Sequence, residues 1–205
     1  MPSIAEIRRR LAAHHPVTQP LAGMRQAAVA MILRDAGPLP EVLFIERASH
    51  PGDPWSGHMA FPGGRIDTGD SDPRAAAERE TFEEVGLELA NAEPLGRLDD
   101  VHGHHAAGVA SLVISAFVYR TQGEQLLVPN HEVREAFWFP VSSLLEPARF
   151  VEHPVQRAQR AGFPGILVGE PDRHVVWGLT YRFLESFFRV VGRPLPDRWT
   201  QLRAG

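Results

Sequence analysis

The most constraining feature of the sequence is the stretch FPGGRIDTGDSDPRAAAERETFEEVGL at residues 61–87. Asp72-Pro73 is typical of a helix start, because Asp caps the first amides and Pro suits the first turn. Gly86 is typical of a helix end, so the sequence predicts a helix over 73–85. Pro62-Gly63-Gly64 stops the preceding strand and lets the backbone approach a neighbouring group closely. A strand, a glycine turn, an acidic loop and a capped helix should therefore follow one another.

Three acids collect on one side of this helix. At about 100° per residue, Glu80, Glu83 and Glu84 fall within an arc of roughly 100°. The opposite face, which should be buried, carries Ala75, Phe82 and Val85. Like charges at this spacing repel by roughly 0.2–0.5 kcal/mol per pair, and a divalent cation would reverse that sign. Carboxylates suit hard ions such as Mg²⁺ or Mn²⁺, although an acidic face on a solvated helix is the ordinary alternative.

Composition narrows the class of protein. The net charge of −4 gives no general attraction to nucleic acid or to a membrane surface. The chain has no Cys, which excludes disulfides and thiolate zinc sites, and all 21 basic residues are Arg. Phosphate must therefore be bound by guanidinium groups, which hold it through two parallel hydrogen bonds. The sequence shows neither a signal peptide nor a membrane-spanning run, which predicts a cytoplasmic protein.

The rest of the chain predicts a mixed sheet packed against helices, an α/β (α+β) fold, because strand patterns alternate with only two or three helical ones. Helices are expected at 3–14, 73–85 and 176–191, with a helical turn at 141–147. Strands are expected at 27–33, 42–45, 58–61, 112–119, 136–139 and 166–168. We divide the chain into a helical N-terminal extension (1–22), one main domain (23–195) and a tail (196–205).

The acidic helix and its preceding loop resemble the Nudix box. That motif runs Gly, five residues, Glu, seven residues, Arg-Glu, an apolar residue, any residue, Glu-Glu, any residue, Gly and an apolar residue. The matching positions here are Gly64, Arg79, Glu80, Glu83, Glu84, Gly86 and Leu87. Asp70 replaces the first Glu, eight residues separate it from Arg79, and Thr81 stands where an aliphatic residue is usual. The resemblance implies an α/β/α sandwich that hydrolyses a small-molecule nucleotide, a nucleoside diphosphate linked to another group.

The resemblance also implies roles for residues. Mg²⁺ or Mn²⁺ would be held by Glu80, Glu83, Glu84 and the backbone carbonyl of Gly63. The catalytic group is then Arg79, Glu80, Glu83 and Glu84, and the expected substrate contacts are Arg47, Gly63, Gly64 and Arg65. Arg79 could hold Asp70 by a charge-assisted hydrogen bond. The proton of the attacking water could pass to Glu80 or to an additional acid, for which Glu132 and Glu135 are the candidates.

A second resemblance concerns the substrate. ERASHPGDPWSGHMAFPGGR is similar to the motif upstream of the box in coenzyme A-type Nudix enzymes, with matches at Arg47, Ala48, Gly57 and 61–64. Trp177-Gly178-Leu179-Thr180 resembles a helix common in that subgroup. Gly52 stands where that motif has a second Arg, so another Arg must bind the 3′-phosphate of coenzyme A. Arg25, Arg47 and Arg65 are the candidates, and we select Arg47.

Other interpretations stay open from the sequence. The substrate could instead be ADP-ribose, a dinucleotide or a damaged nucleoside triphosphate. A non-catalytic nucleotide sensor usually loses one of these acids, and this chain keeps them. The sequence leaves a homodimer open and predicts no nucleic-acid or membrane partner. His102, His104 and His105 could form a zinc site, but a polar loop beside the cleft is the more ordinary interpretation. The helical aromatic set, expected to be core, is Trp177, Phe183, Phe187 and Phe188.

Overall fold

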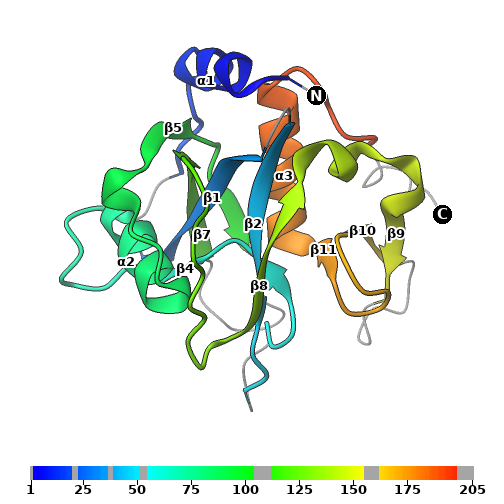
Figure 1. Cartoon of the computed structure of the whole chain (residues 1–205). Coiled ribbons are helices and arrows are strands. Elements are labelled where there is room, and N and C mark those ends of the chain that lie inside the picture. Colours follow the sequence, from blue (N-terminus) through cyan, green and yellow to red (C-terminus); the bar gives the residue numbers. More distant parts are fainter. Residues whose placement is uncertain are drawn as a thin grey trace.

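A computed structural model describes residues 2–19, 23–36, 39–50, 55–103, 112–154 and 162–197. Within these ranges, eight strands form a mixed sheet with helices on both faces (Figure 1). A separate three-stranded sheet lies beside it, in the order β11-β10-β9. The expected α/β/α sandwich is therefore confirmed.

The element bounds follow the chain. The helices are α1 Ile4–Ala12, α2 Pro73–Val85 and α3 Gly178–Val190, with short 3-10 turns η1 Leu89–Asn91, η2 Val141–Leu145 and η3 Pro147–Arg149. The strands of the main sheet are β1 Arg25–Ala36, β2 Leu39–Arg47, β3 Met59–Ala60, β4 Gly63–Arg65, β5 Glu93–Arg97, β6 Val101–Gly103, β7 Leu112–Thr121 and β8 Val133–Pro140. The smaller sheet contains β9 Phe150–His153, β10 Phe163–Leu167 and β11 Val175–Trp177.

Strand β1 is central because it has a different antiparallel partner at each end. Its last residues pair with β2, as in Leu33↔Val42, and its first residues pair with β4, as in Val29↔Gly63. Its other edge runs parallel to β7 over ten residue pairs. The split between β2 and β4 places the glycine turn beside helix α2, where the acids lie.

Side chains of β1 alternate between two cores, as the two-residue period of a strand requires. Ala28, Ala30 and Ile32 face the core under α2, whereas Met31 and Leu33 face the core under α3 and α1. Helix α1 contributes buried side chains to the second core. The N-terminal helix is thus part of the main packing, and the boundaries at residues 22 and 196 stay predictions.

Most expected elements are confirmed, usually with longer strands, because sheet pairing extends beyond the apolar run. The expected loop at 99–105 is wrong in part, since 101–103 form β6 against β7. The helix expected from 176 begins at Gly178 because 175–177 pair with β10. Among the described helices, none combines the length and apolar character needed to cross a membrane.

Candidate active site

Helix α2 has the predicted bounds because its two ends are capped locally. The Asp72 carboxylate accepts the N–H of Ala75 at 2.8 Å, and Gly86 ends the helix with φ 71°. The predicted buried face is wrong in part. Phe82 is 52% exposed, whereas Glu84 is 1% exposed. The side chains packed on the sheet include the small Ala76 and Ala77, with Val85 and Thr81. The physical reason is that small side chains let α2 approach β1 and β4 closely.

Thr81, the departure from the Nudix pattern, fits this buried face. Its hydroxyl donates to the carbonyl of Ala77 at 2.7 Å, so no buried hydroxyl lacks a partner there. The substitution therefore leaves the helix position intact.

The glycine turn presses the backbone of β4 against two acids. The N–H of Gly63 donates to Glu84 Oε2 at 2.8 Å, and its φ of 146° suits glycine alone. A Cβ on Gly64 would lie 2.4–2.6 Å from the carboxyl atoms of Glu80. Both positions therefore require glycine, and any larger residue would move a carboxylate.

Arg79 ties the acidic loop to the helix. Its Nε and Nη2 reach Oδ1 and Oδ2 of Asp70, each at 2.9 Å, which confirms the expected pair in spite of the extra residue between them. Its Nη1 lies 3.1 Å from both Glu80 and Glu83, and its Nη2 also donates to the carbonyl of Arg65 at 3.2 Å. One guanidinium thus orients three carboxylates and cannot neutralise all of them.

The electrostatics show excess negative charge in this site. Burial, together with the charges of Glu80 and Glu132, raises the pKa of Glu84 to about 8, against the lowering effects of the Gly63 N–H and Arg47. Burial also raises the pKa of Glu80, despite its contact with Arg79. Arg47 Nη1 lies 3.7 Å from Glu84 Oε1, a loose ion pair. The donors are all oxygens, and a divalent cation would relieve their repulsion, so the residues present fit Mg²⁺ or Mn²⁺.

The two candidates for an additional acid are separated by the fold. Glu132 contributes charge to the sites of both Glu80 and Glu84, and its backbone carbonyl accepts the N–H of Ala48 at 2.8 Å. Glu135 instead pairs with Arg173, at 2.7 Å. Glu132 is thus the candidate on the side of the helix acids.

A second acidic cluster, formed by Glu46, Glu135 and His174, lies on the α3 side of the sheet. The ring of Phe137, which packs against the α3 core, is 5.2 Å from His174. Arg173 Nη2 reaches Glu46 at 2.6 Å and Glu135 at 2.7 Å. Although burial raises the pKa of Glu46, the hydrogen bond and charge of Arg173 outweigh it and hold that pKa below its usual value.

The protonation of His174 argues against a metal in the second cluster. The N–H of Glu170 donates to His174 Nδ1 at 3.0 Å, so a neutral ring carries its proton on Nε2. That nitrogen lies 3.5 Å from Glu46 and 3.4 Å from Glu135 and offers them a proton, not a lone pair. Sequence reasoning missed this cluster. Glu46 and Arg173 are 127 residues apart, and no local spacing connects them.

The remaining predicted residues divide as follows. Phe183, Phe187 and Phe188 are buried core, as expected, while Trp177 is partly exposed and packs against His58 and His153. Gly52, His104 and His105 lie outside the described residues.

Comparison with known proteins agrees with this geometry. The model of the NUDIX domain matches residues 24–159. The chain belongs to the Nudix family. It is 30% identical over 172 residues to the uncharacterized Nudix hydrolase NudL of Escherichia coli, covering 82% of this chain and 83% of that protein. It is 38% identical over 113 residues to an uncharacterized protein of Schizosaccharomyces pombe, covering 53% of this chain but only 34% of the other.

Solved structures show the same fold. The MutT/nudix family protein from Enterococcus faecalis has a TM-score of 0.56 at 18% identity and covers 93% of this chain and 70% of its own. The NUDIX hydrolase from Alicyclobacillus acidocaldarius has a TM-score of 0.52 at 18% identity, and the match covers 89% of this chain and 97% of that one. This Nudix hydrolase is thus a member of a family of pyrophosphohydrolases that act on nucleoside diphosphate derivatives and generally use divalent metals.

Proposed function

We propose that this Nudix hydrolase cleaves the diphosphate of coenzyme A or of an acyl derivative, giving 3′,5′-ADP and (acyl-)4′-phosphopantetheine. One observation carries the proposal: the two segments that resemble the coenzyme A subgroup meet. Thr180 Oγ1, in the WGLT segment, donates to the carbonyl of Met59 at 3.2 Å, across 121 residues of sequence. The rings of His58 and Trp177 lie 4.6 Å apart. Two motifs that share one place in the fold support one shared role.

The described ends of the upstream motif also contact each other. The N–H of Arg47 donates to the carbonyl of His58 at 3.1 Å, and the N–H of Gly57 donates to the carbonyl of Arg47 at 3.0 Å. Gly57 has a φ of 73°, which supports the presence of glycine at this point of the motif. The described residues of the motif therefore contact both Glu84, through Arg47, and the start of α3, through Met59.

The acids have separate roles in the proposed reaction. Glu80, Glu83 and Glu84 would hold Mg²⁺ or Mn²⁺, with the carbonyl of Gly63 as a further ligand. The bound ion would offset charge developing on the diphosphate and make water more acidic. Arg79 holds the carboxylates in place. A carboxylate, Glu80 or Glu132, accepts the proton of the attacking water as the new O–P bond forms and the bridging P–O bond breaks.

A substrate panel tests the proposal. Coenzyme A, acetyl-coenzyme A, ADP-ribose, a dinucleoside polyphosphate and nucleoside triphosphates are compared by kcat/KM in Mg²⁺ and in Mn²⁺, with products identified by mass spectrometry. We expect coenzyme A or its acyl form to be preferred, with 3′,5′-ADP as a product. A preference for ADP-ribose or a nucleoside triphosphate would contradict the proposed substrate, whereas the proposed metal-dependent hydrolysis would still stand.

A further inference from the structure

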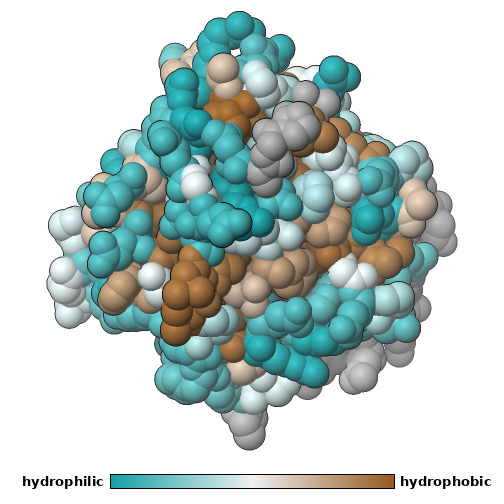
Figure 2. All heavy atoms as spheres, in the orientation of Figure 1, coloured by the Kyte–Doolittle hydropathy of each residue, from teal (hydrophilic) through white to brown (hydrophobic). Residues whose placement is uncertain are grey.

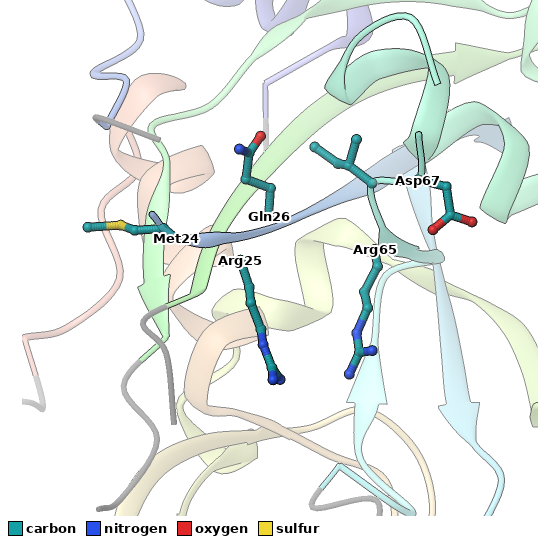
Figure 3. Close-up of a pocket in the computed structure, with 6 residues that line it drawn as sticks. Met24, Arg25, Gln26, Arg65 and Asp67 are labelled. Carbon is teal, nitrogen blue, oxygen red and sulfur yellow. The ribbon is translucent and has the colours of Figure 1, made fainter. Parts of the chain in front are cut away.

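A second site adjoins the acids, at the point where β1 and β4 pair. A pocket of about 440 Å³ is lined there by Met24, Arg25, Gln26, Arg65, Ile66 and Asp67. Figure 3 shows that the side chains of Arg25 and Arg65 extend from the two strands in the same direction, whereas Gln26 points the other way. Two guanidinium groups therefore converge on one region.

The strand register explains this convergence. Arg65 pairs with Ala27, and Arg25 lies two residues before Ala27 on the same face. Arg25 and Arg65 are thus diagonal neighbours, a placement that separates two residues by roughly 7–8 Å and lies within reach of long side chains. Their like charges repel, and an anion between them would reverse the sign of that interaction. A phosphate has the shape and charge that a pair of guanidinium forks accepts.

Both guanidinium groups are available for a ligand. Within the described ranges, neither side chain has a hydrogen bond or an ion pair, and both residues are exposed. Arg79, by contrast, is occupied by Asp70 and the helix acids. The carboxylate of Asp67, which also lines the pocket, is turned aside in Figure 3 and lies 3.9 Å from Arg79 Nη2.

The pocket is one residue away from the acid site. Arg65 directly follows Gly64, whose α-carbon faces Glu80, and the carbonyl of Arg65 accepts a hydrogen bond from Arg79. Because side chains alternate along a strand, Gly64 faces α2 and Arg65 faces the other side. If the diphosphate of a substrate lies at the acids of α2, another group of the same substrate can reach Arg25 and Arg65 by crossing the short strand β4.

We propose that Arg25 and Arg65 bind a second phosphate of the substrate, a phosphomonoester that is not cleaved. The site would select nucleoside diphosphate derivatives that carry an extra phosphate over those that lack it. This inference rests on the proposed function and gives it a specificity determinant. It also revises the role expected for Arg47, whose guanidinium lies beside Glu84 and is better placed for the diphosphate itself.

The test compares substrates that differ by one phosphate. The ratio of kcat/KM for coenzyme A to that for dephospho-coenzyme A is measured in the wild type and in Arg25→Ala, Arg65→Ala and the double variant. Loss of charge-assisted hydrogen bonds to a phosphate should lower this ratio by roughly ten- to hundredfold. Arg65→Ala keeps the carbonyl that Arg79 uses. Arg25→Lys and Arg65→Lys should restore part of the ratio, because they return the charge without the fork.

Two controls separate the site from general effects of charge. Arg193→Ala removes an exposed arginine just past the end of α3, where the neighbouring Gly192 lies against Arg10, and should leave the ratio unchanged. Arg47→Ala should lower kcat/KM for both substrates alike. Equal losses on both substrates in the Arg25 and Arg65 variants would overturn the inference. A loss specific to ATP, tested in parallel, would assign the site to a chain-terminal phosphate and would overturn the assignment to a phosphomonoester outside the cleaved chain.

A binding measurement keeps the inference distinct from the proposed function. By calorimetry without metal, 3′,5′-ADP should bind the wild type more tightly than 5′-AMP, and the double variant should lose the difference. If coenzyme A is not hydrolysed but this difference is present, the proposed function fails and the phosphate site stands. If coenzyme A is hydrolysed and the difference is absent, the phosphate site fails alone.

Discussion

Within the described residues, two clusters of carboxylates lie on opposite faces of the main sheet, and the pKa values of their glutamates are shifted in opposite directions. On the α2 side, burial raises the pKa of both Glu84 and Glu80. On the α3 side, Arg173 holds the pKa of the buried Glu46 below its usual value. Both clusters contain at least two neighbouring acids, so the residue types alone do not show which cluster could bind a cation.

The difference lies in how the arginines are distributed. In the second cluster, Arg173 contacts both Glu46 and Glu135, and Arg134 lies 3.2 Å from Glu46. In the first, Arg79 is shared among Asp70, Glu80 and Glu83. Among the arginines that the structure describes, the one near the most buried acid, Glu84, is Arg47, at 3.7 Å. We therefore propose that the cluster closed by arginine is structural and that the acids of α2, whose charge is less balanced, hold the cation.

The largest expected effect is on activity when the metal is removed. A chelator in excess should abolish hydrolysis, and added Mg²⁺ should restore it, because the helix acids would lose the ion that offsets their repulsion. Glu135→Gln, in the closed cluster, should keep the same Mg²⁺ dependence as the wild type. Undiminished turnover in chelator would contradict the metal assignment, and the steady-state rate measures it directly.

The next effect is on turnover when one acid is neutralised. Glu83→Gln and Glu84→Gln should each lower kcat by about two orders of magnitude or more, as expected for charges that act on the transition state. Circular dichroism should show the folded state in both variants. The matched Glu135→Gln should change kcat by less than tenfold. Comparable losses in all three variants would erase the distinction between the clusters.

A smaller effect concerns the stability of the closed cluster. Glu46→Gln leaves Arg173 without its buried charged partner and should lower the free energy of unfolding by about 1.5–3 kcal/mol. Glu84→Gln in metal-free protein should have the opposite sign at pH 9, because it removes a buried charge from a repulsive site. Urea denaturation of both variants, without metal, measures whether each substitution lowers or raises the free energy of unfolding. Destabilisation by both changes would show that the acids of α2 are structural.

The smallest expected effect is the change in metal-free stability for each unit of pH. The pKa of Glu84 in the folded protein, about 8, lies above 4.5, the ordinary value for a glutamate side chain. The stabilisation that Glu84 contributes to the free energy of unfolding is therefore complete below pH 4.5 and is lost as the pH rises through 8. The slope is at most about 1.4 kcal/mol per pH unit. Glu46, with a lowered pKa, contributes above pH 4.5 and loses stability as the pH falls. Denaturation midpoints of wild type and Glu84→Gln should converge as the pH decreases.

The sequence by itself determined helix α2 and its loop, because these depend on contacts between near neighbours. Asp72 caps the amide of Ala75, and Gly86 adopts the left-handed conformation that ends the helix. The Arg79–Asp70 pair also spans only nine residues. Local chemistry of this kind can be read from spacing, and the family resemblance added the acids and their order.

Only the tertiary structure decided which residues of α2 are buried and which distant groups meet. Phe82 is exposed and Glu84 is buried because the position of β1 and β4, not the helix itself, selects the packed face. Strand pairing between distant segments places Glu132, and not Glu135, on the side of the α2 acids. It also brings Arg173 to Glu46, and Arg25 to Arg65. The free energy of a buried charge depends on its whole surroundings, and those are assembled from segments that are far apart in the sequence.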